Sequence, residues 1–183
     1  IRGVGRETPL PPTLQGDHLI VDGALVSGNR VTLSSLLLTN GATLTHDGTT
    51  DTFESRLELN VGDLNISSDS QIDVSGRGYL GGFNGANFVN WTGRTLGNTV
   101  NGGSMRRNGG SYGGLGAFGD AEQVANATYG SFYDPNELGS GGGSDSNPGG
   151  SGGGLIRIVS EVLTLSGRIL ANGDNGSRYA GGG

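Results

Sequence analysis

Carboxylates are the side chains of this sequence best suited to catalysis, because paired Asp and Glu groups hydrolyse glycosidic bonds. Glu54 and Glu58 are four residues apart, and Asp69 and Asp73 flank a predicted strand. Residues i and i+4 share a strand face only within one straight strand, and no pattern in the sequence indicates a cleft. We therefore predict outward-facing, solubilising carboxylates, assign no catalytic residue, and expect the chain not to be an enzyme. A polysaccharide lyase or hydrolase stays open as a second alternative.

Nucleophilic and phosphate chemistry find no support in the residues. The sequence has no Cys, and His18 and His46 occur without a G-x-S-x-G elbow. Each histidine is predicted to be an exposed residue at a strand end. All eleven basic residues are Arg, so no lysine is present for a Walker-type phosphate loop.

Calcium is the one cofactor that the sequence suggests. Asp145 and Asn147, and separately Asp174, place oxygen donors beside glycines, as a hard cation requires. Neither segment follows the EF-hand spacing or a nonapeptide repeat. Asx-turns explain both segments equally well, so both interpretations remain open.

Glycine and aromatic residues alternate in one long region. Residues 76–154 hold 25 of the 39 glycines, without the G-x-y period of collagen. Aromatic rings interrupt the glycines, unlike in a Gly/Ser linker. Flat rings stack on the apolar faces of sugars, so four of them are candidate ligand-binding residues: Trp91, Tyr112, Tyr129 and Tyr133. The alternative is that the rings close a small core of the region itself.

Charge and hydropathy limit the partners. The net charge of −6 and the scattered arginines, apart from Arg106-Arg107, disfavour nucleic acid. No apolar run is long enough to span a membrane. The first residue is not Met and the sequence stops within a glycine run, so we expect a piece of a longer protein.

Short β-type runs separated by Asn-Gly, Asp-Gly and Ser-Gly turns occur before and after the glycine-rich region. Residues 64–75 and 163–172 share one order of strand, Ser turn and strand, which suggests stacked coils. We predict an all-β chain: an extended lead-in over 1–16, then a single domain over 17–183. Its expected fold is a parallel β-helix (β-solenoid) with 76–154 as a long inserted loop of tight turns. An antiparallel β-sandwich is the alternative, supported by Asn40-Gly41 and Asp47-Gly48.

Three segments carry a resemblance to known proteins: GGSYGGLG at 109–116, NELGSGGGS at 136–144 and GGGLIRI at 152–158. With their surroundings, over roughly residues 17–183, they resemble the glycine-rich repeats of very large secreted or cell-surface bacterial proteins. Those modules are similar to the right-handed, pectin-lyase-like β-helix class. The resemblance implies that fold and an extracellular setting, but no reaction.

Together these observations predict a secreted or cell-surface structural and adhesive module. Its expected partners are copies of itself or adjacent repeats of a longer parent chain, joined end to end into fibres through unpaired strand edges. The alternative function is carbohydrate binding through the aromatic residues of the glycine-rich region.

Overall fold

The computed structural model describes residues 1–3, 6–119, 124–131, 133–177 and 180–183. Contacts between residues divide the chain into two compact units. The first, here the strand unit, consists of Ile1–Asp47, Arg56–Asp73 and Ile156–Leu170. The second, here the glycine unit, consists of Gly48–Ser55, Val74–Leu155 and Ala171–Gly183. The prediction that 17–183 is one domain with an inserted loop stays a prediction.

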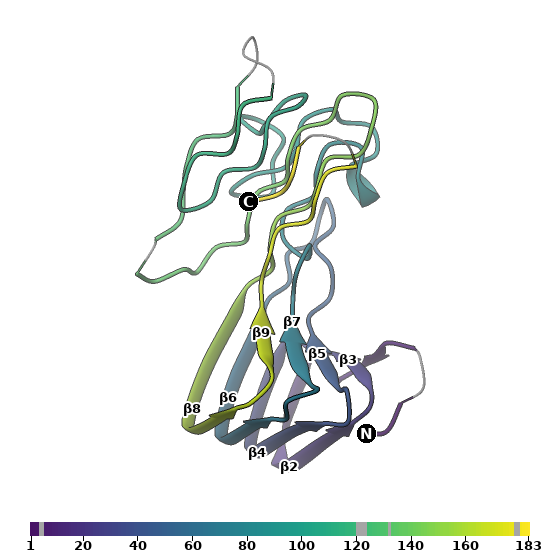
Figure 1. Ribbon diagram of the computed structural model, residues 1–183, viewed down its shortest axis with the longest axis vertical. Coiled ribbons are helices and arrows are strands. Elements are labelled where there is room, and N and C mark those ends of the chain that lie inside the picture. The colour runs from purple at the N-terminus through teal and green to yellow at the C-terminus, as the bar shows by residue number, and fades with distance from the viewer. Residues whose placement is uncertain (4–5, 120–123, 132, 178–179) are drawn as a thin grey trace. The chain divides into compact units, whose positions relative to one another are not determined.

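Two parallel sheets build the strand unit (Figure 1). The four-stranded sheet contains, in spatial order, β2 (Thr13–Asp22), β4 (Arg30–Thr39), β6 (Leu57–Ile66) and β8 (Ile156–Leu165). The five-stranded sheet contains β1 (Thr8–Pro9), β3 (Leu25–Ser27), β5 (Thr43–Thr45), β7 (Gln71–Asp73) and β9 (Arg168–Leu170). Each long strand is followed in the chain by a short strand of the other sheet, so successive layers repeat one path.

The burial pattern along β6 shows which residues of a long strand face the core. In β6 the buried positions alternate over Leu57, Leu59 and Val61, then shift by one residue at Gly62-Asp63 before Leu64 and Ile66. A Cβ on Gly62 would lie 2.6 Å from the carbonyl oxygen of Ser34. Glycine therefore permits the close approach of β4 at this shift.

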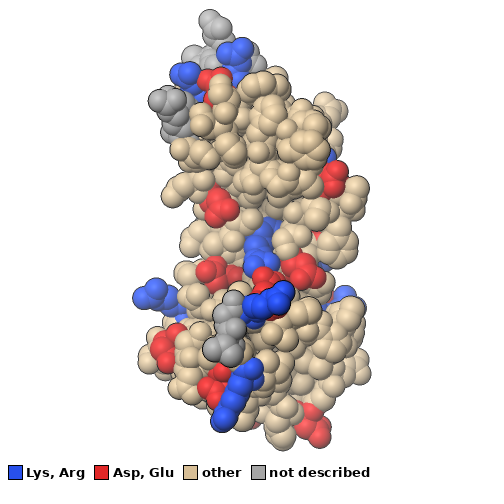
Figure 2. Space-filling model, turned by 90° about the vertical axis from the view of Figure 1, so that its right-hand side faces the viewer, with Lys and Arg blue, Asp and Glu red and all other residues tan. Residues whose placement is uncertain are grey.

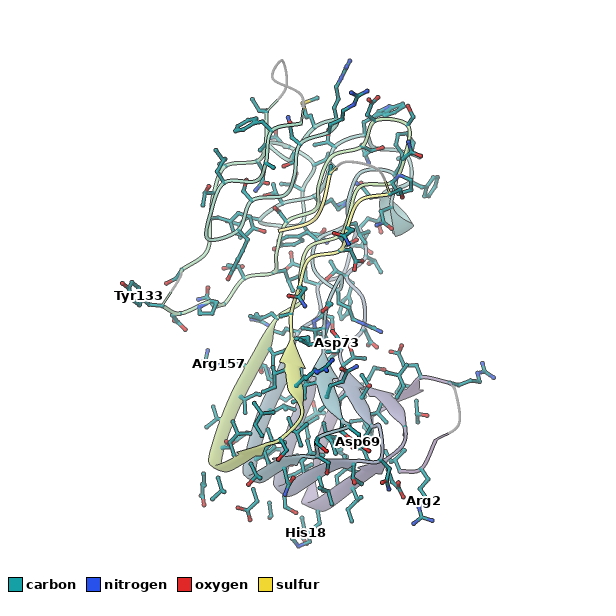
Figure 3. The ribbon with its side chains drawn as sticks, in the orientation of Figure 1. Arg2, His18, Asp69, Asp73, Tyr133 and Arg157 are labelled. Atoms are coloured by element: carbon teal, nitrogen blue, oxygen red, sulfur yellow. The ribbon has the colours of Figure 1, made fainter. Side chains whose placement is uncertain are left out.

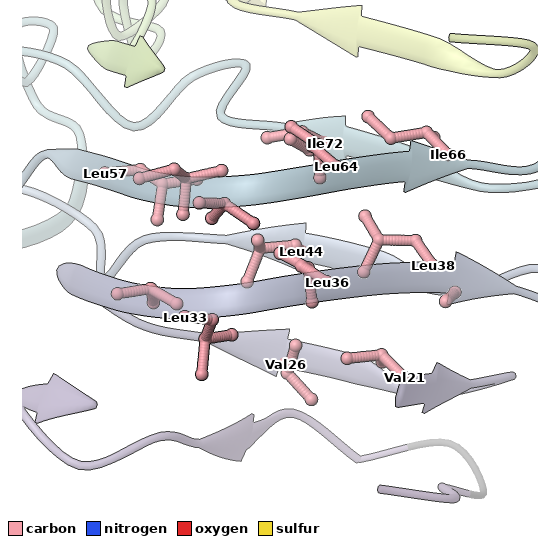
Figure 4. Close-up of a cluster of buried hydrophobic side chains, with 14 of the residues drawn as sticks. Val21, Val26, Leu33, Leu36, Leu38, Leu44, Leu57, Leu64, Ile66 and Ile72 are labelled. Atoms are coloured by element: carbon pink, nitrogen blue, oxygen red, sulfur yellow. The ribbon is translucent and has the colours of Figure 1, made fainter. Parts of the chain in front are cut away.

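Parallel pairing stacks these residues in columns between the sheets. Leu36 pairs with Leu64, and Leu38 with Ile66, each at most 1% exposed. The column of the short strands runs from Val26 through Leu44 to Ile72. Figure 4 shows these side chains gathered between the strands. Each layer thus buries its apolar residues against the next, as in the parallel sheets of other proteins.

The structure corrects the expected fold class. It shows two parallel sheets and no closed solenoid among the described residues, and every pair of named strands is parallel, which also rules out the antiparallel sandwich. The sequence runs of three to five residues had been interpreted as separate strands of uniform coils. Instead, some of these runs lie within ten-residue strands, and others form the three-residue strands of the second sheet. The returns to the next long strand, 28–29, 46–56 and 74–155, differ too much in length to repeat one coil.

The glycine unit is held by backbone hydrogen bonds with a period of three residues. The N–H groups of Tyr79 and Gly82 donate to the carbonyls of Gly139 and Gly142, and those of Gly139 and Gly142 donate to Gly153 and Gly150. The same interval recurs where the N–H groups of residues 150 and 153 donate to the carbonyls of residues 180 and 183. A β-strand would repeat every two residues, whereas three residues per turn is the period of a polyproline II helix. The unit is therefore a bundle of extended, threefold segments.

Residues 139–143 form backbone hydrogen bonds with several other segments of the glycine unit. Residues 139–143 exchange hydrogen bonds with 79–82, with 150–153, and with single residues at 94, 108 and 183. A Cβ on Gly152 would lie 1.9 Å from the Gly139 oxygen, and one on Gly139 would lie 2.2 Å from the Gly183 oxygen. The surroundings of residues 139–143 are thus made largely of backbone, and glycine is required at positions 139 and 152 because no side chain fits there. Residues 139–143 are therefore an interior segment of the glycine unit.

Candidate functional site

A hollow of about 350 Å³ in the glycine unit is lined by Trp91, Met105, Arg106, Ser144 and Asp145. It combines a flat aromatic ring, a thioether, a cation, a hydroxyl and a carboxylate. Binding sites for small polar ligands have this composition, since apolar walls provide contact area and a few polar groups fix orientation. We call it the Trp91 hollow.

Three chain segments meet at the Trp91 hollow through backbone contacts. The N–H of Ser144 donates to the carbonyl of Trp91 at 2.8 Å, and the N–H of Gly143 donates to that of Asn108 at 2.9 Å. A Cβ on Gly143 would lie 2.4 Å from the carbonyl carbon of Met105. Glycine at this position therefore lets residues 105–106 lie directly beside 143–145.

The Trp91 side chain is held in place yet accessible. Its ring meets that of Phe83 edge to face, with centroids 4.4 Å apart and planes at 86°. The residue is still 52% exposed. Such edge-to-face pairs are a preferred arrangement of aromatic rings, so Phe83 orients an indole that offers free surface to a ligand.

An ion pair fixes the carboxylate at the hollow. Nε of Arg107 donates to Oδ2 of Asp145 at 2.7 Å. The preceding residue, Arg106, has a φ of 51°, and this left-handed backbone turn places consecutive arginines in different directions. Arg107 therefore orients Asp145, while Arg106 lines the hollow.

The four aromatic residues predicted to bind ligand have different environments. Of these, Trp91 alone lines the hollow. Tyr112 and Tyr129 meet edge to face at 5.4 Å, and the Tyr129 hydroxyl donates to the Leu138 carbonyl at 2.6 Å. Tyr129 packs against the buried cluster of Tyr79, Leu138 and Leu155, and both interpretations of the aromatic residues stay predictions. Tyr133 is 93% exposed and projects from the unit (Figure 3).

The residues predicted to bind calcium have other contacts. Asp145 pairs with Arg107, the carbonyl of Asn147 accepts from the Ser144 hydroxyl at 2.7 Å, and the carbonyl of Asp174 accepts from the N–H of Gly182. Across the described ranges, no three or more His, Cys, Asp or Glu side chains are grouped as metal ligands would be. A calcium site stays a prediction.

The strand unit has its own shallow hollow over β4, β6 and β8, of about 370 Å³, which includes Arg30, Glu58 and Arg157. Its carboxylate, Glu58, is bound by Arg30 at 2.9 Å and by Arg56 at 3.6 Å. Glycoside hydrolysis needs two carboxyl groups across the substrate. The lining residues include only this one, so we do not propose catalysis there.

Asp69, Asp73 and the histidines lie outside both hollows. Asp73 is the last residue of β7 and Asp69 precedes the strand (Figure 3), so only Asp69 lies outside it, and Asp69 accepts from the Ser70 hydroxyl at 3.0 Å. His18 is exposed within β2, and its ring contacts the Ser35 hydroxyl at 2.7 Å. The prediction of exposure is wrong for His46, which is 0% exposed and whose Nδ1 lies 2.7 Å from the Asp47 carbonyl oxygen.

Three residues of the Trp91 hollow were missed by sequence reasoning: Met105, Arg106 and Ser144. Their one visible signal is the Arg106-Arg107 pair, the only adjacent arginines of the chain. That pair had been considered only as a contact for nucleic acid. On the face in Figure 2, acidic and basic side chains are interspersed.

In three comparisons, no protein-family model, curated protein or solved structure matches the chain. The described part of the chain includes no helix with the length and apolar character needed to cross a bilayer.

Proposed function

We propose that this chain is an extracellular structural and adhesive module that binds carbohydrate in the Trp91 hollow. The observation that carries the proposal is the half-exposed indole of Trp91 beside Asp145 and Arg106. The stacked apolar columns of the strand unit support the structural part, because such layers form a rigid scaffold.

Each wall of the hollow suits one part of a sugar. The indole provides flat apolar area for the C–H face of a pyranose ring. Asp145 can accept hydrogen bonds from ring hydroxyls, and the Arg106 guanidinium can donate to sugar oxygens. The Ser144 hydroxyl donates its one hydrogen to the Asn147 carbonyl, so toward a sugar its oxygen can only accept. Hydrogen bonds to charged partners are the stronger ones, so Asp145 and Arg106 are the residues expected to select among sugars.

Charge favours a neutral glycan over a polyanion as the ligand. The chain carries a net charge of −6, which repels an extended anionic polymer. The lining of the hollow includes one cation, Arg106, and one anion, Asp145, and Asp145 is already paired with Arg107. We therefore expect neutral polysaccharides to bind more tightly than polyuronates.

A glycan array followed by calorimetric titration tests the proposal. Trp91→Ala should weaken binding by about tenfold or more, since an aromatic contact and its buried area together contribute about 1.5 kcal/mol or more. Tyr133→Ala removes a more exposed aromatic ring that lies outside the hollow and should leave binding unchanged. Equal losses for both variants, or no binding of any neutral or acidic glycan by the wild type, would contradict the proposal.

A further inference from the structure

The last strand of the four-stranded sheet, β8, ends the strand unit with an open edge. It pairs with β6 along its length, and no partner on its other side is present among the described residues. An unpaired edge presents a row of backbone N–H and C=O groups that can bind another strand.

The core columns of the strand unit end uncovered on β8. Leu163 pairs with Leu64, and Leu165 with Ile66. The two β6 residues are at most 1% exposed, whereas Leu163 and Leu165 are each 47% exposed. Val159 and Val162, on the other face of β8, are 57% and 53% exposed. Apolar surface on both faces of one edge strand marks an interaction site.

The order of residues along β8 is symmetric in polarity. From the two ends inward, its sequence IRIVSEVLTL gives the pairs Ile156 with Leu165, Arg157 with Thr164, Ile158 with Leu163, Val159 with Val162, and Ser160 with Glu161. Apolar residues thus match apolar residues at three of the five positions, and no pair joins like charges. A strand with this symmetry is complementary to itself in the antiparallel direction.

We propose that a second copy of this chain binds at this edge, with the two β8 strands antiparallel about a twofold axis between Ser160 and Glu161. Val159 of each copy then lies opposite Val162 of the other on one face of the joined sheet. Ile158 likewise lies opposite Leu163 on the core face, where the exposed end of each column is covered. The contact is isologous, so it closes as a dimer.

The other end of the strand unit is covered only in part, since β2 has no strand on its outer side among the described residues. There the backbone of Ile1 bonds to the Ile20 carbonyl and to the Asp22 N–H. The short strand β1 covers the edge of β3, followed by the buried Leu10. Head-to-tail stacking would have to displace this segment. The proposal therefore replaces the expected fibres with a closed pair, and it is independent of the Trp91 hollow.

Sedimentation equilibrium of the full chain over a wide range of concentrations tests the dimer, in buffered salt that screens the net charge of −6 on each copy. The wild type should show a monomer–dimer equilibrium. Val162→Lys should raise the dissociation constant by about tenfold or more, because the twofold axis repeats the altered pair twice. Ile20→Lys, on the opposite edge strand and also 53% exposed, should not change it.

The antiparallel register is tested by a compensating variant. Val159→Glu combined with Val162→Lys places opposite charges across the axis and should restore dimerisation relative to Val162→Lys alone. A wild type that stays monomeric at every concentration would overturn the proposal. So would larger species that grow with concentration and respond to Ile20→Lys, because they indicate head-to-tail association. Failure of restoration would overturn the register and with it the twofold arrangement.

Discussion

At the scale of single residues, Asn126 organises the polar interior of the glycine unit. It is 1% exposed, and its Oδ1 accepts from the Ser111 N–H at 2.7 Å and from the Ser104 hydroxyl at 2.9 Å. Its Nδ2 donates to the Ala127 carbonyl at 2.9 Å and to Thr95 Oγ1 at 3.1 Å. The Asn126 side chain thus provides hydrogen-bond partners for several polar groups that are buried away from solvent.

Asn126→Ala should destabilise the protein by about 3 kcal/mol, because each buried group that loses its partner costs about 1–3 kcal/mol. Urea denaturation followed by tryptophan fluorescence measures the change. Asn175→Ala, at an exposed position, is the control and should stay within about 0.5 kcal/mol of wild type. Equal stability of the two variants would mean that the Asn126 network contributes little.

At the scale of elements, the two units use opposite means of burial. The strands bury branched side chains in columns, and their stability derives from apolar area. The threefold segments bury their backbone, whose N–H and C=O groups form hydrogen bonds with neighbouring segments. Their close packing therefore depends on the absence of side chains at the contact positions. Adding a side chain at a closely packed glycine of the glycine unit should therefore be severely destabilising.

Glycine-to-alanine substitutions should separate the two kinds of glycine in the glycine unit. Gly152→Ala would place its Cβ 1.9 Å from the Gly139 oxygen, so segment 139–143 must move; we expect a loss of about 3 kcal/mol or more. A Cβ on Gly114 meets nothing within 4 Å, and Gly114→Ala should be neutral or stabilising by up to about 1 kcal/mol. Chemical denaturation of both variants checks the contrast, and similar values would refute close backbone packing.

At the scale of the whole molecule, the units also differ in chemistry. No Phe, Trp or Tyr falls within the ranges of the strand unit, so aromatic spectroscopy reports on the glycine unit alone. In that unit burial, together with the nearby charge of Glu54, raises the pKa of the Tyr79 hydroxyl above its ordinary value of 10.0. Burial also raises the pKa of Tyr129. Both hydroxyls are therefore neutral in the folded protein well into alkaline conditions.

Alkaline pH should destabilise the glycine unit selectively. The folded pKa of Tyr79 is raised, so its contribution to stability is complete below pH 10.0 and declines above it, as the unfolded chain releases the proton first. The decline is at most about 1.4 kcal/mol per pH unit for each such tyrosine. Trp91 fluorescence should change before the far-ultraviolet signal of the strands, and Tyr79→Phe should reduce the pH dependence. Ionisation of Tyr79 itself near pH 10.0 without loss of structure, measured as the absorbance difference between wild type and Tyr79→Phe, would contradict this expectation.

The sequence by itself determined the strand-rich segments, the separation of glycine and aromatic residues from them, and the candidate Trp91. These features depend on local alternation and composition, which neighbouring residues set. The sequence could not determine that short runs join into ten-residue strands, because the shift at Gly62-Asp63 interrupts the alternation without ending the strand.

Tertiary structure alone decided the two parallel sheets, the backbone core of the glycine unit and the composition of the Trp91 hollow. The hydrogen bond between Ser144 and Trp91 joins residues far apart in the sequence, and glycine has no side chain whose pattern could reveal its neighbours. Likewise, Leu163 and Leu64 look equivalent as residues. Only the stacking order shows that Leu64 is buried and Leu163 is exposed, because burial depends on whether another strand layer covers the residue.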